Sequence, residues 1–337
     1  MRNIYDLTIK ELEDYFISIN EKKFRAVQVY EALYKRRIKS FDDMTNISKE
    51  VREKLKQDFS FYKIKMLIKQ QGKNVNKYLF ELEDGNKIES VLMFHDYGTS
   101  ICVSSQVGCN MTCAFCESGR LKKVRNLLAH EMVQQILQIE EDINKRITHV
   151  VLMGIGEPFD NYDNVLRFVK IINCGKGIDI GSRHITISTC GVIPGIKKFM
   201  NEEGQVNLAI SLHAPNNTLR SRIMPINKAY PLNELMETIK EYINKTNRRV
   251  TFEYIMLDNV NDSEENAKEL ALLLKGINCY VNLIPYNETE NIKFKRTKEW
   301  KIMKFYDILK KNKINVTIRK EFGGSVDAAC GQLRANN

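Results

Sequence analysis

The chain has 337 residues, of which 43% are hydrophobic and 9% aromatic, as in an ordinary folded globular protein. No apolar run approaches the ~18 residues of a membrane-spanning helix. The N-terminal segment mixes acidic and basic residues from its start, so we expect no signal peptide. The composition therefore predicts a cytoplasmic protein without a membrane partner.

Lys and Arg outnumber Asp and Glu by 52 to 42, which gives a formal net charge of +10. Most of this surplus lies in the first 80 residues, which hold 18 basic residues against 11 acidic ones. A basic module on a nearly neutral body is typical of a protein that binds a polyanion such as RNA. A solvated basic surface without a partner would have the same composition.

The first part of the chain predicts helices. Apolar residues recur at spacings of three and four over residues 8–19, 24–37 and 48–59. Residues 77–94 then alternate around Asp84-Gly85, which indicates a β-hairpin. We therefore expect a helical, basic accessory domain over residues 1–82.

From residue 99 onward, short β-branched runs alternate with longer helical patterns. The predicted strands cover 100–105, 149–154, 185–191, 207–213, 250–257, 280–286 and 314–322. This order indicates a parallel sheet covered by helices. We predict an α/β fold with a partial (β/α)6 barrel over 83–310 and a C-terminal extension over 311–337. A doubly wound sheet is the alternative.

Polar residues follow several of these predicted strands directly. They are Gly156, Glu157, Ser188, Ser211, His213 and Asn287. In (β/α) barrels the carboxyl ends of the strands form the rim that carries the functional site. The convergence of these positions favours the barrel and predicts one site at its mouth, although each residue alone could serve a loop or a helix cap.

Eight cysteines occur, and three of them, Cys109, Cys113 and Cys116, stand within eight residues. Structural zinc normally needs four protein ligands, usually in two separated pairs, and a distant fourth ligand is conceivable. A cubane iron–sulfur cluster held by three thiolates keeps one iron open for a substrate or cofactor. Cys174, Cys190 and Cys279 stand alone, and we expect them to be buried core residues.

The CxxxCxxC spacing in a loop after the first barrel strand resembles that of the radical S-adenosylmethionine (radical SAM) enzymes. The resemblance implies that Cys109, Cys113 and Cys116 ligate a [4Fe–4S] cluster whose open iron binds S-adenosylmethionine. Phe115 matches the aromatic position of the motif. Gly156 and Glu157, in MGIGEP, resemble the strand end that binds the methionine part of this cofactor.

Further segments resemble the RlmN branch of the RlmN/Cfr RNA methyltransferase family. They recur in order over nearly all of residues 86–335 and include CVSSQVGC, MGIGEPFDNYDNVL, VNLAISLHAPN, MPINKAYPL and AACGQL. The resemblance implies that Cys330 is the acceptor cysteine that carries a methyl group, Cys102 the resolving cysteine and Glu89 the proton acceptor. It places S-adenosylmethionine at Gly156, Glu157, Ser188, Ser211, Leu212, His213 and Asn287.

The expected activity is methylation of carbon 2 of an adenine in 23S rRNA and of the adenine 3′ of the anticodon in tRNAs. The resemblance implies a methylcysteine intermediate, a transient disulfide between Cys102 and Cys330, an electron donor such as flavodoxin or ferredoxin, and a monomer. One alternative is Cfr-type methylation of carbon 8. Another is a non-catalytic RNA-binding protein with a metal cluster. Residues 117–124 and 323–329 depart from the family's usual chemistry.

Overall fold

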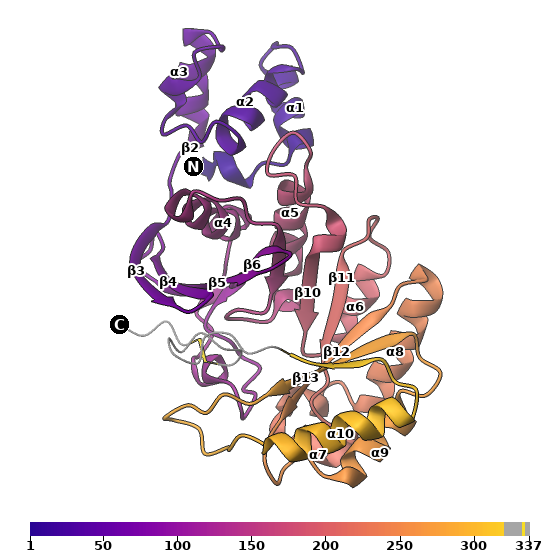
Figure 1. The fold of residues 1–337 in the computed structure, drawn as a ribbon. Helices are drawn as coiled ribbons and strands as arrows, with labels where there is room; N and C mark the ends of the chain where they lie inside the picture. The colour runs from indigo at the N-terminus through magenta and orange to yellow at the C-terminus, as the bar shows by residue number, and fades with distance from the viewer. Residues whose placement is uncertain (320–331, 334–337) are drawn as a thin grey trace.

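A computed structural model describes residues 1–319 and 332–333 (Figure 1). The chain begins with a helical module made of α1 (Ile9–Ser18), α2 (Arg25–Tyr34) and α3 (Lys49–Asp58). Thr8 caps α1 in a reciprocal capping box with Glu11, and the Ser48 side chain caps α3. The short parallel pair β1 (Arg2–Asn3) and β2 (Phe59–Ser60) joins the two ends of this module. The three predicted N-terminal helices are thus confirmed.

Ten strands of the described chain form one sheet. From edge to edge they are β14 (Val316–Ile318), β13 (Cys279–Pro285), β12 (Val250–Met256), β11 (Asn207–Ser211), β10 (Ile185–Thr189), β9 (His149–Leu152), β6 (Gly98–Cys102), β5 (Lys87–His95), β4 (Val75–Glu81) and β3 (Lys65–Gly72). Neighbours from β14 to β6 are parallel, and those from β6 to β3 are antiparallel. A doubly wound sheet reverses its strand order, and this one does not.

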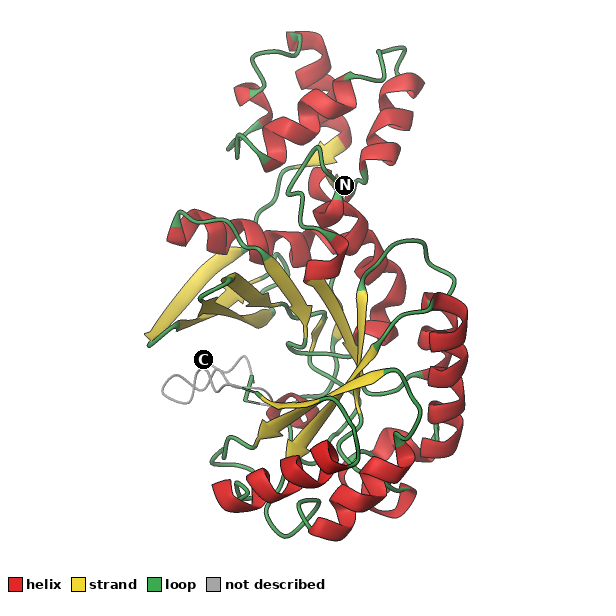
Figure 2. Ribbon diagram, turned by 45° about the vertical axis from the view of Figure 1, so that its right-hand side comes forward, coloured by secondary structure: helices red, strands yellow, loops and turns green. Residues whose placement is uncertain are grey.

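Helices connect the parallel strands and lie along the outer side of the curved sheet (Figure 2). They are α4 (Ala129–Ile143), α5 (Tyr162–Asn173), α6 (Ile193–Phe199), α7 (Asn217–Ile223), α8 (Leu232–Thr246), α9 (Glu264–Leu273) and α10 (Glu299–Lys311). Each connection between successive parallel strands carries at least one of them. The predicted partial (β/α)6 barrel is confirmed.

Helices are predicted for the first 80 residues, but the last helix of the N-terminal module, α3, ends at Asp58. The strands β3 and β4 that follow belong to the large sheet. β3 is an edge strand whose residues are mostly exposed on both faces, so Lys65–Gly72 carries no clear alternation of apolar and polar residues. The antiparallel strands β3, β4 and β5 extend the parallel barrel beyond β6. The predicted hairpin around Asp84-Gly85 is β4–β5.

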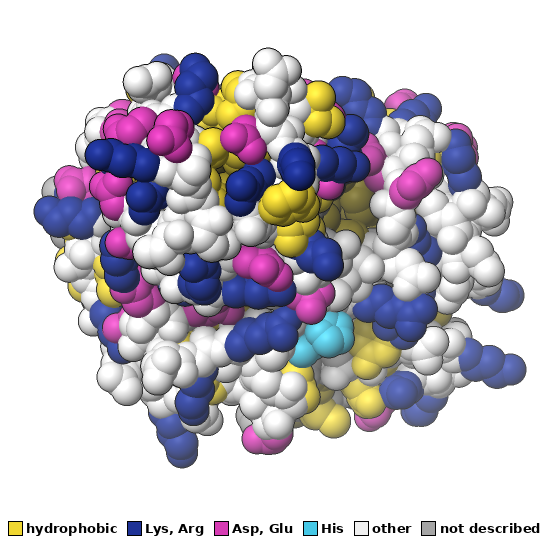
Figure 3. All heavy atoms as spheres, turned by 90° about the horizontal axis from the view of Figure 1, so that it is seen from above, with side chains coloured by type: hydrophobic (Ala, Val, Ile, Leu, Met, Phe, Trp, Pro, Cys, Tyr) yellow, Lys and Arg dark blue, Asp and Glu magenta, His cyan; other side chains and the backbone are white. Residues whose placement is uncertain are grey.

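The helical module caps the end of the molecule shown from above in Figure 3. Basic side chains are scattered over this face with acidic ones between them, so they form no continuous basic patch there. Within the described ranges, no helix is long and apolar enough to cross a membrane.

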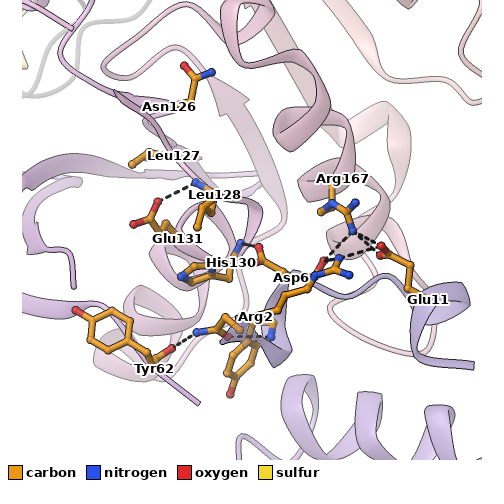
Figure 4. Close-up of polar contacts among 12 residues, drawn as sticks. Arg2, Asp6, Glu11, Tyr62, Asn126, Leu127, Leu128, His130, Glu131 and Arg167 are labelled. Carbon is orange, nitrogen blue, oxygen red and sulfur yellow. Dashed lines mark hydrogen bonds and ion pairs between the residues drawn. The ribbon is translucent and has the colours of Figure 1, made fainter. Parts of the chain in front are cut away.

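A buried polar seam fixes the helical module to the barrel (Figure 4). The Asp6 carboxylate accepts a hydrogen bond from the backbone N–H of His130 at 2.8 Å and lies 3.0 Å from His130 Nδ1. His130 is in the first turn of α4, where backbone N–H groups have no helical partner. Arg167 of α5 pairs with Glu11 of α1. The module is therefore anchored to the first two helices of the barrel.

Candidate active site

The three clustered cysteines lie in the loop between β7 (Gln106–Val107) and β8 (Arg125–Asn126), which pair as a short antiparallel ribbon. All three line a cavity of about 830 Å³, including its open mouth. The backbone N–H of Cys109 donates to the Leu121 carbonyl, and that of Cys116 donates to the Cys113 carbonyl. Gly108 has φ +73°, and a Cβ there would lie 2.2 Å from the Lys122 carbonyl oxygen. Only glycine allows the loop to close this tightly.

Desolvation by burial raises the pKa of the Cys109 thiol to about 12 and that of Cys113 well above its usual value. Thiolates are therefore unfavourable in this cavity unless a positive centre accompanies them. An iron–sulfur cluster would supply that positive centre, because such clusters are held by cysteine thiolates. No disulfide links any two of the cysteines within residues 1–319. The donor set of the loop fits an iron–sulfur cluster.

The loop after β9 forms the next wall of the cavity. Gly156 has φ +108°, and a Cβ there would lie 2.6 Å from the Gln106 side chain. The Glu157 N–H donates to Gln106 Oε1 at 2.9 Å, which holds this loop against the end of the cysteine ribbon. The buried Glu157 carboxylate accepts backbone N–H groups of Phe159 at 3.0 Å and Cys190 at 2.7 Å. Burial raises the pKa of Glu157.

Ser188, Ser211 and His213 complete this wall from the ends of β10 and β11. His213 has φ +59°, and its Nδ1 accepts the Ile255 N–H at 3.0 Å. Its ring meets the edge of Phe115, with ring centroids 4.8 Å apart. Desolvation, reinforced by the charge of Arg220, lowers the pKa of His213 to about 3. His213 is therefore a neutral ring with its proton on Nε2.

Eight of the predicted site residues thus line one cavity: Cys109, Cys113, Cys116, Gly156, Glu157, Ser188, Ser211 and His213. Leu212 is fully buried and does not line it, and its N–H donates to the Glu253 carbonyl at 3.0 Å. Asn287 follows β13 and is also absent from the lining. Cys330 lies outside the described residues.

Cys102 and Glu89 belong to a neighbouring surface, which we call the sheet wall: Lys77, Glu89, Val91 and Cys102. Val91 pairs with Lys77 on one side and with Cys102 on the other. Directly paired residues point to the same face of a sheet, and so do residues two apart on one strand. Lys77 Nζ lies 3.2 Å from Glu89 Oε1, and both side chains are nearly buried, at 11% and 4% exposure.

Residues 332–333 connect the sheet wall with the cavity. Leu333 packs in a small apolar cluster with Cys102 and Val91, and Met153, which lines the cavity, packs against that cluster. The Leu333 carbonyl accepts the Ser118 hydroxyl at 2.7 Å, and Gln332 Nε2 donates to the Glu288 carbonyl at 3.2 Å. Residues 332–333 therefore lie between Cys102 and the cysteine loop, beside the cavity.

Several cavity residues are absent from the predicted site. Cys190 is buried in the core, as expected, and it also lines the cavity, where its backbone N–H donates to Glu157. It lies two residues after Ser188 near the end of the same predicted strand, so the strand-end rule alone could have found it. No sequence pattern of this kind marks the other three: Glu253 and Arg319, which line the cavity, and Arg220, which is buried behind its wall.

Comparison with known families agrees with this geometry. Residues 2–60 match the family described as Ribosomal RNA large subunit methyltransferase N-terminal domain. Residues 103–271 match the Radical SAM superfamily. The first match covers the helical module, and the second runs from the end of β6 into α9.

Close relatives extend over the whole chain. A protein of Spiroplasma citri named "Probable dual-specificity RNA methyltransferase RlmN" is 54% identical over 341 residues, covering 100% of this chain and 98% of the relative. A protein of Enterococcus faecalis with the same name is 54% identical and covers 99% of this chain and 96% of the relative. The solved structure of a radical SAM methyltransferase from Sphaerobacter thermophilus has a TM-score of 0.94 at 41% identity, with 100% of both chains covered.

Proposed function

The chain belongs to the RlmN family of radical SAM RNA methyltransferases, and on that premise we propose that it methylates carbon 2 of an adenine in 23S rRNA and of the adenine 3′ of the anticodon in tRNAs. The observation that carries this proposal is a site in two connected parts. A cavity with three thiols lies beside a sheet wall with a fourth thiol and a carboxylate.

Cys109, Cys113 and Cys116 would hold a [4Fe–4S] cluster. Gly156, Glu157, Ser188, Ser211, Leu212, His213 and Asn287 would hold S-adenosylmethionine. When bound, this pair supplies a radical that removes a hydrogen atom from a methyl group. The two buried backbone N–H bonds to Glu157 fix its carboxylate at the cavity wall, and neutral His213 presents an N–H. Flavodoxin or ferredoxin as the electron donor and a monomeric enzyme are parts of the same proposal.

The sheet wall would carry out the transfer. Cys330 carries the methyl group as a thioether, and its carbon becomes bonded to carbon 2 of the adenine. Glu89 accepts the proton that leaves the ring. The Cys102 thiolate would then attack the Cys330 sulfur. The S–S bond of a transient disulfide forms, the bond from the Cys330 sulfur to the transferred carbon breaks, and that carbon takes up a proton to become the methyl group of the released base. Leu333, three residues after Cys330, packs in the same apolar cluster as Cys102, which supports this pairing.

Lys77 would assist Glu89, because its ammonium group contacts the Glu89 carboxylate. The pair is nearly buried, so an adenine ring that enters beside it meets little water. The ammonium group supplies a hydrogen-bond donor that helps to fix the position of the carboxylate.

The test is the methylated nucleoside that the reconstituted protein makes. The protein is supplied anaerobically with iron, sulfide, S-adenosylmethionine, a reductant and either 23S rRNA fragments or tRNA, and the RNA is digested and measured by mass spectrometry. We expect 2-methyladenosine from both substrates, and none from a Cys330→Ala control. A product methylated at carbon 8 would establish the Cfr-type alternative instead. A protein that forms a cluster but methylates neither RNA would contradict the proposal.

A further inference from the structure

Arg220 of α7 is a buried cation among neutral groups. Its side chain is 0% exposed, and it donates only to uncharged acceptors. These acceptors are the carbonyl oxygens of Leu212 (3.2 Å), Cys190 (2.6 Å) and Ser211 (3.3 Å) and the Asn227 side-chain oxygen (2.9 Å). In the described ranges, no carboxylate forms an ion pair with it. Burying a charge without an opposite charge is strongly unfavourable, because the group loses its hydration and gains no ionic attraction in return.

The guanidinium lies directly behind the wall that faces the three-cysteine loop. Two of its carbonyl partners belong to Cys190 and Ser211, which line the cavity. The last residue of α7, Ile223, accepts the backbone N–H of Ala114 from inside the cysteine loop at 2.9 Å. Helix α7 is therefore attached to the cysteine loop and to the strand ends at the same time.

The field of Arg220 reaches the thiols of this cavity. Desolvation raises the pKa of Cys113, while the charge of Arg220 acts to lower it. The same charge helps to keep His213 neutral. The two buried carboxylates that also line the cavity have other partners. Glu157 accepts backbone N–H groups, and Glu253 accepts the Asn282 amide at 2.8 Å. The anion that would balance Arg220 is thus missing from the described protein groups.

We propose that Arg220 is the counter-cation of the iron–sulfur cluster and raises its reduction potential. The inference rests on the proposed function, because three thiolates around the cluster give it a net negative charge in both oxidation states. Reduction adds one more electron, so a fixed cation nearby stabilises the reduced state more than the oxidised state. The low dielectric behind the wall strengthens this effect. Arg220 is a positioning and tuning residue, since its donors are occupied by the loops.

The experiment compares four reconstituted proteins: the natural chain, Arg220→Lys, Arg220→Gln and Asn227→Ala. Iron content gives cluster occupancy, and a redox titration followed by electron paramagnetic resonance gives the midpoint potential. We expect Arg220→Gln to lower the ratio of reduced to oxidised cluster about tenfold at a fixed solution potential, equivalent to about 59 mV for one electron. Arg220→Lys keeps the charge and stays near the natural value. Asn227→Ala removes one hydrogen bond of the guanidinium, together with the amide's own bonds to Asn217 and Ser221, but no charge. Its midpoint potential should also stay near the natural value.

The Lys and Gln variants separate charge from structure, because both lose the guanidinium's hydrogen-bond pattern. Equal potentials in Arg220→Gln and the natural protein would overturn the inference. So would an equal loss of cluster in Arg220→Lys and Arg220→Gln, which would indicate a structural role. Loss of cluster in Arg220→Gln alone would support it. If the natural chain itself takes up no iron, the proposed function fails, and that result is distinct from all of these.

Discussion

At the scale of single residues, the position of Cys102 predicts a trapped intermediate. In the proposed mechanism a Cys102→Ala variant would lack the thiolate that releases the base, so a covalent adduct between protein and RNA should accumulate under turnover conditions. Cys330→Ala should form none, because it has no sulfur to carry the methyl group. Cys279→Ala, a buried cysteine in β13, is the matched control and should turn over normally. Denaturing gels with labelled RNA measure the adduct, and its absence in Cys102→Ala would refute the resolving role.

His213 makes the stability of the protein depend on pH. Its folded pKa is about 3, below the value of about 6.5 for an unfolded histidine. Below pH 6.5 the unfolded state therefore binds a proton that the folded state does not, and stability falls by about 1.4 kcal/mol per pH unit until the folded pKa is reached. Urea unfolding at pH 7, 6 and 5 measures this slope. His213→Asn, whose side chain tolerates φ +59°, should flatten it. If the stability of His213→Asn depended on pH as strongly as that of the natural protein, groups other than His213 would cause the pH dependence.

Lys77 and Glu89 form the nearly buried pair of the sheet wall, at 3.2 Å. Removing the Lys77 ammonium with Lys77→Met leaves the carboxylate without this partner, and the cost of breaking a buried pair is on the order of 3–5 kcal/mol. We expect a clear drop in the urea midpoint together with slower methylation. Lys77→Arg, which keeps the charge, should recover more of both than Lys77→Met. The exposed pair of Lys10 and Asp14 is the comparison, because Lys10→Met should leave the urea midpoint nearly unchanged.

At the scale of secondary-structure elements, Asp6 ties the helical module to α4. Its carboxylate satisfies a backbone N–H in the first turn of that helix and lies near the positive end of the helix dipole. Asp6→Ala should lower the free energy of unfolding by about 1–3 kcal/mol. It should also speed proteolytic cleavage near residues 59–64, where the module joins β3. Asp14→Ala on the exposed face of α1 should do neither. If Asp6→Ala and Asp14→Ala were cleaved by the protease at the same rate, the result would argue against a docking role for Asp6.

The elements show what the sequence pattern can and cannot predict. The alternation of strands and helices can be predicted from the sequence because the central parallel strands are largely buried and the helices have one apolar side, as in β12 and α10. The sequence does not predict β3, because this exposed edge strand has no buried face and so no alternation of apolar and polar residues. The rim residues follow from the rule that strand ends meet at one edge. Contacts between distant segments cannot be predicted in this way. The contacts of Asp6 with His130 and of Arg220 with Cys190 produce no periodic pattern in the sequence.

At the scale of the whole molecule, the basic N-terminal module predicts salt-dependent RNA binding. Each phosphate contact contributes a slope of about −0.7 to −0.9 in log K against log salt. Lys22→Glu and Lys49→Glu, both exposed on the module, should weaken binding uniformly and reduce the slope by about one each. Lys275→Glu, exposed after α9 on the barrel, is the control and should change little. Fluorescence anisotropy with tRNA measures the slope. An affinity that does not change with salt would show that the module does not bind RNA through its basic residues.

The direction of the sheet changes at β6, which is parallel to β9 on one side and antiparallel to β5 on the other. The residues that we propose to bind the cofactors follow β6 and the parallel strands, whereas Glu89 and Lys77 belong to the antiparallel strands β5 and β4. Cys102 is on β6, the strand that both parts share. In the proposed mechanism the sheet would therefore have two parts with separate tasks, radical production and group transfer. A lineage could therefore change which ring atom is modified by altering β4 and β5, while the radical-producing half stayed the same.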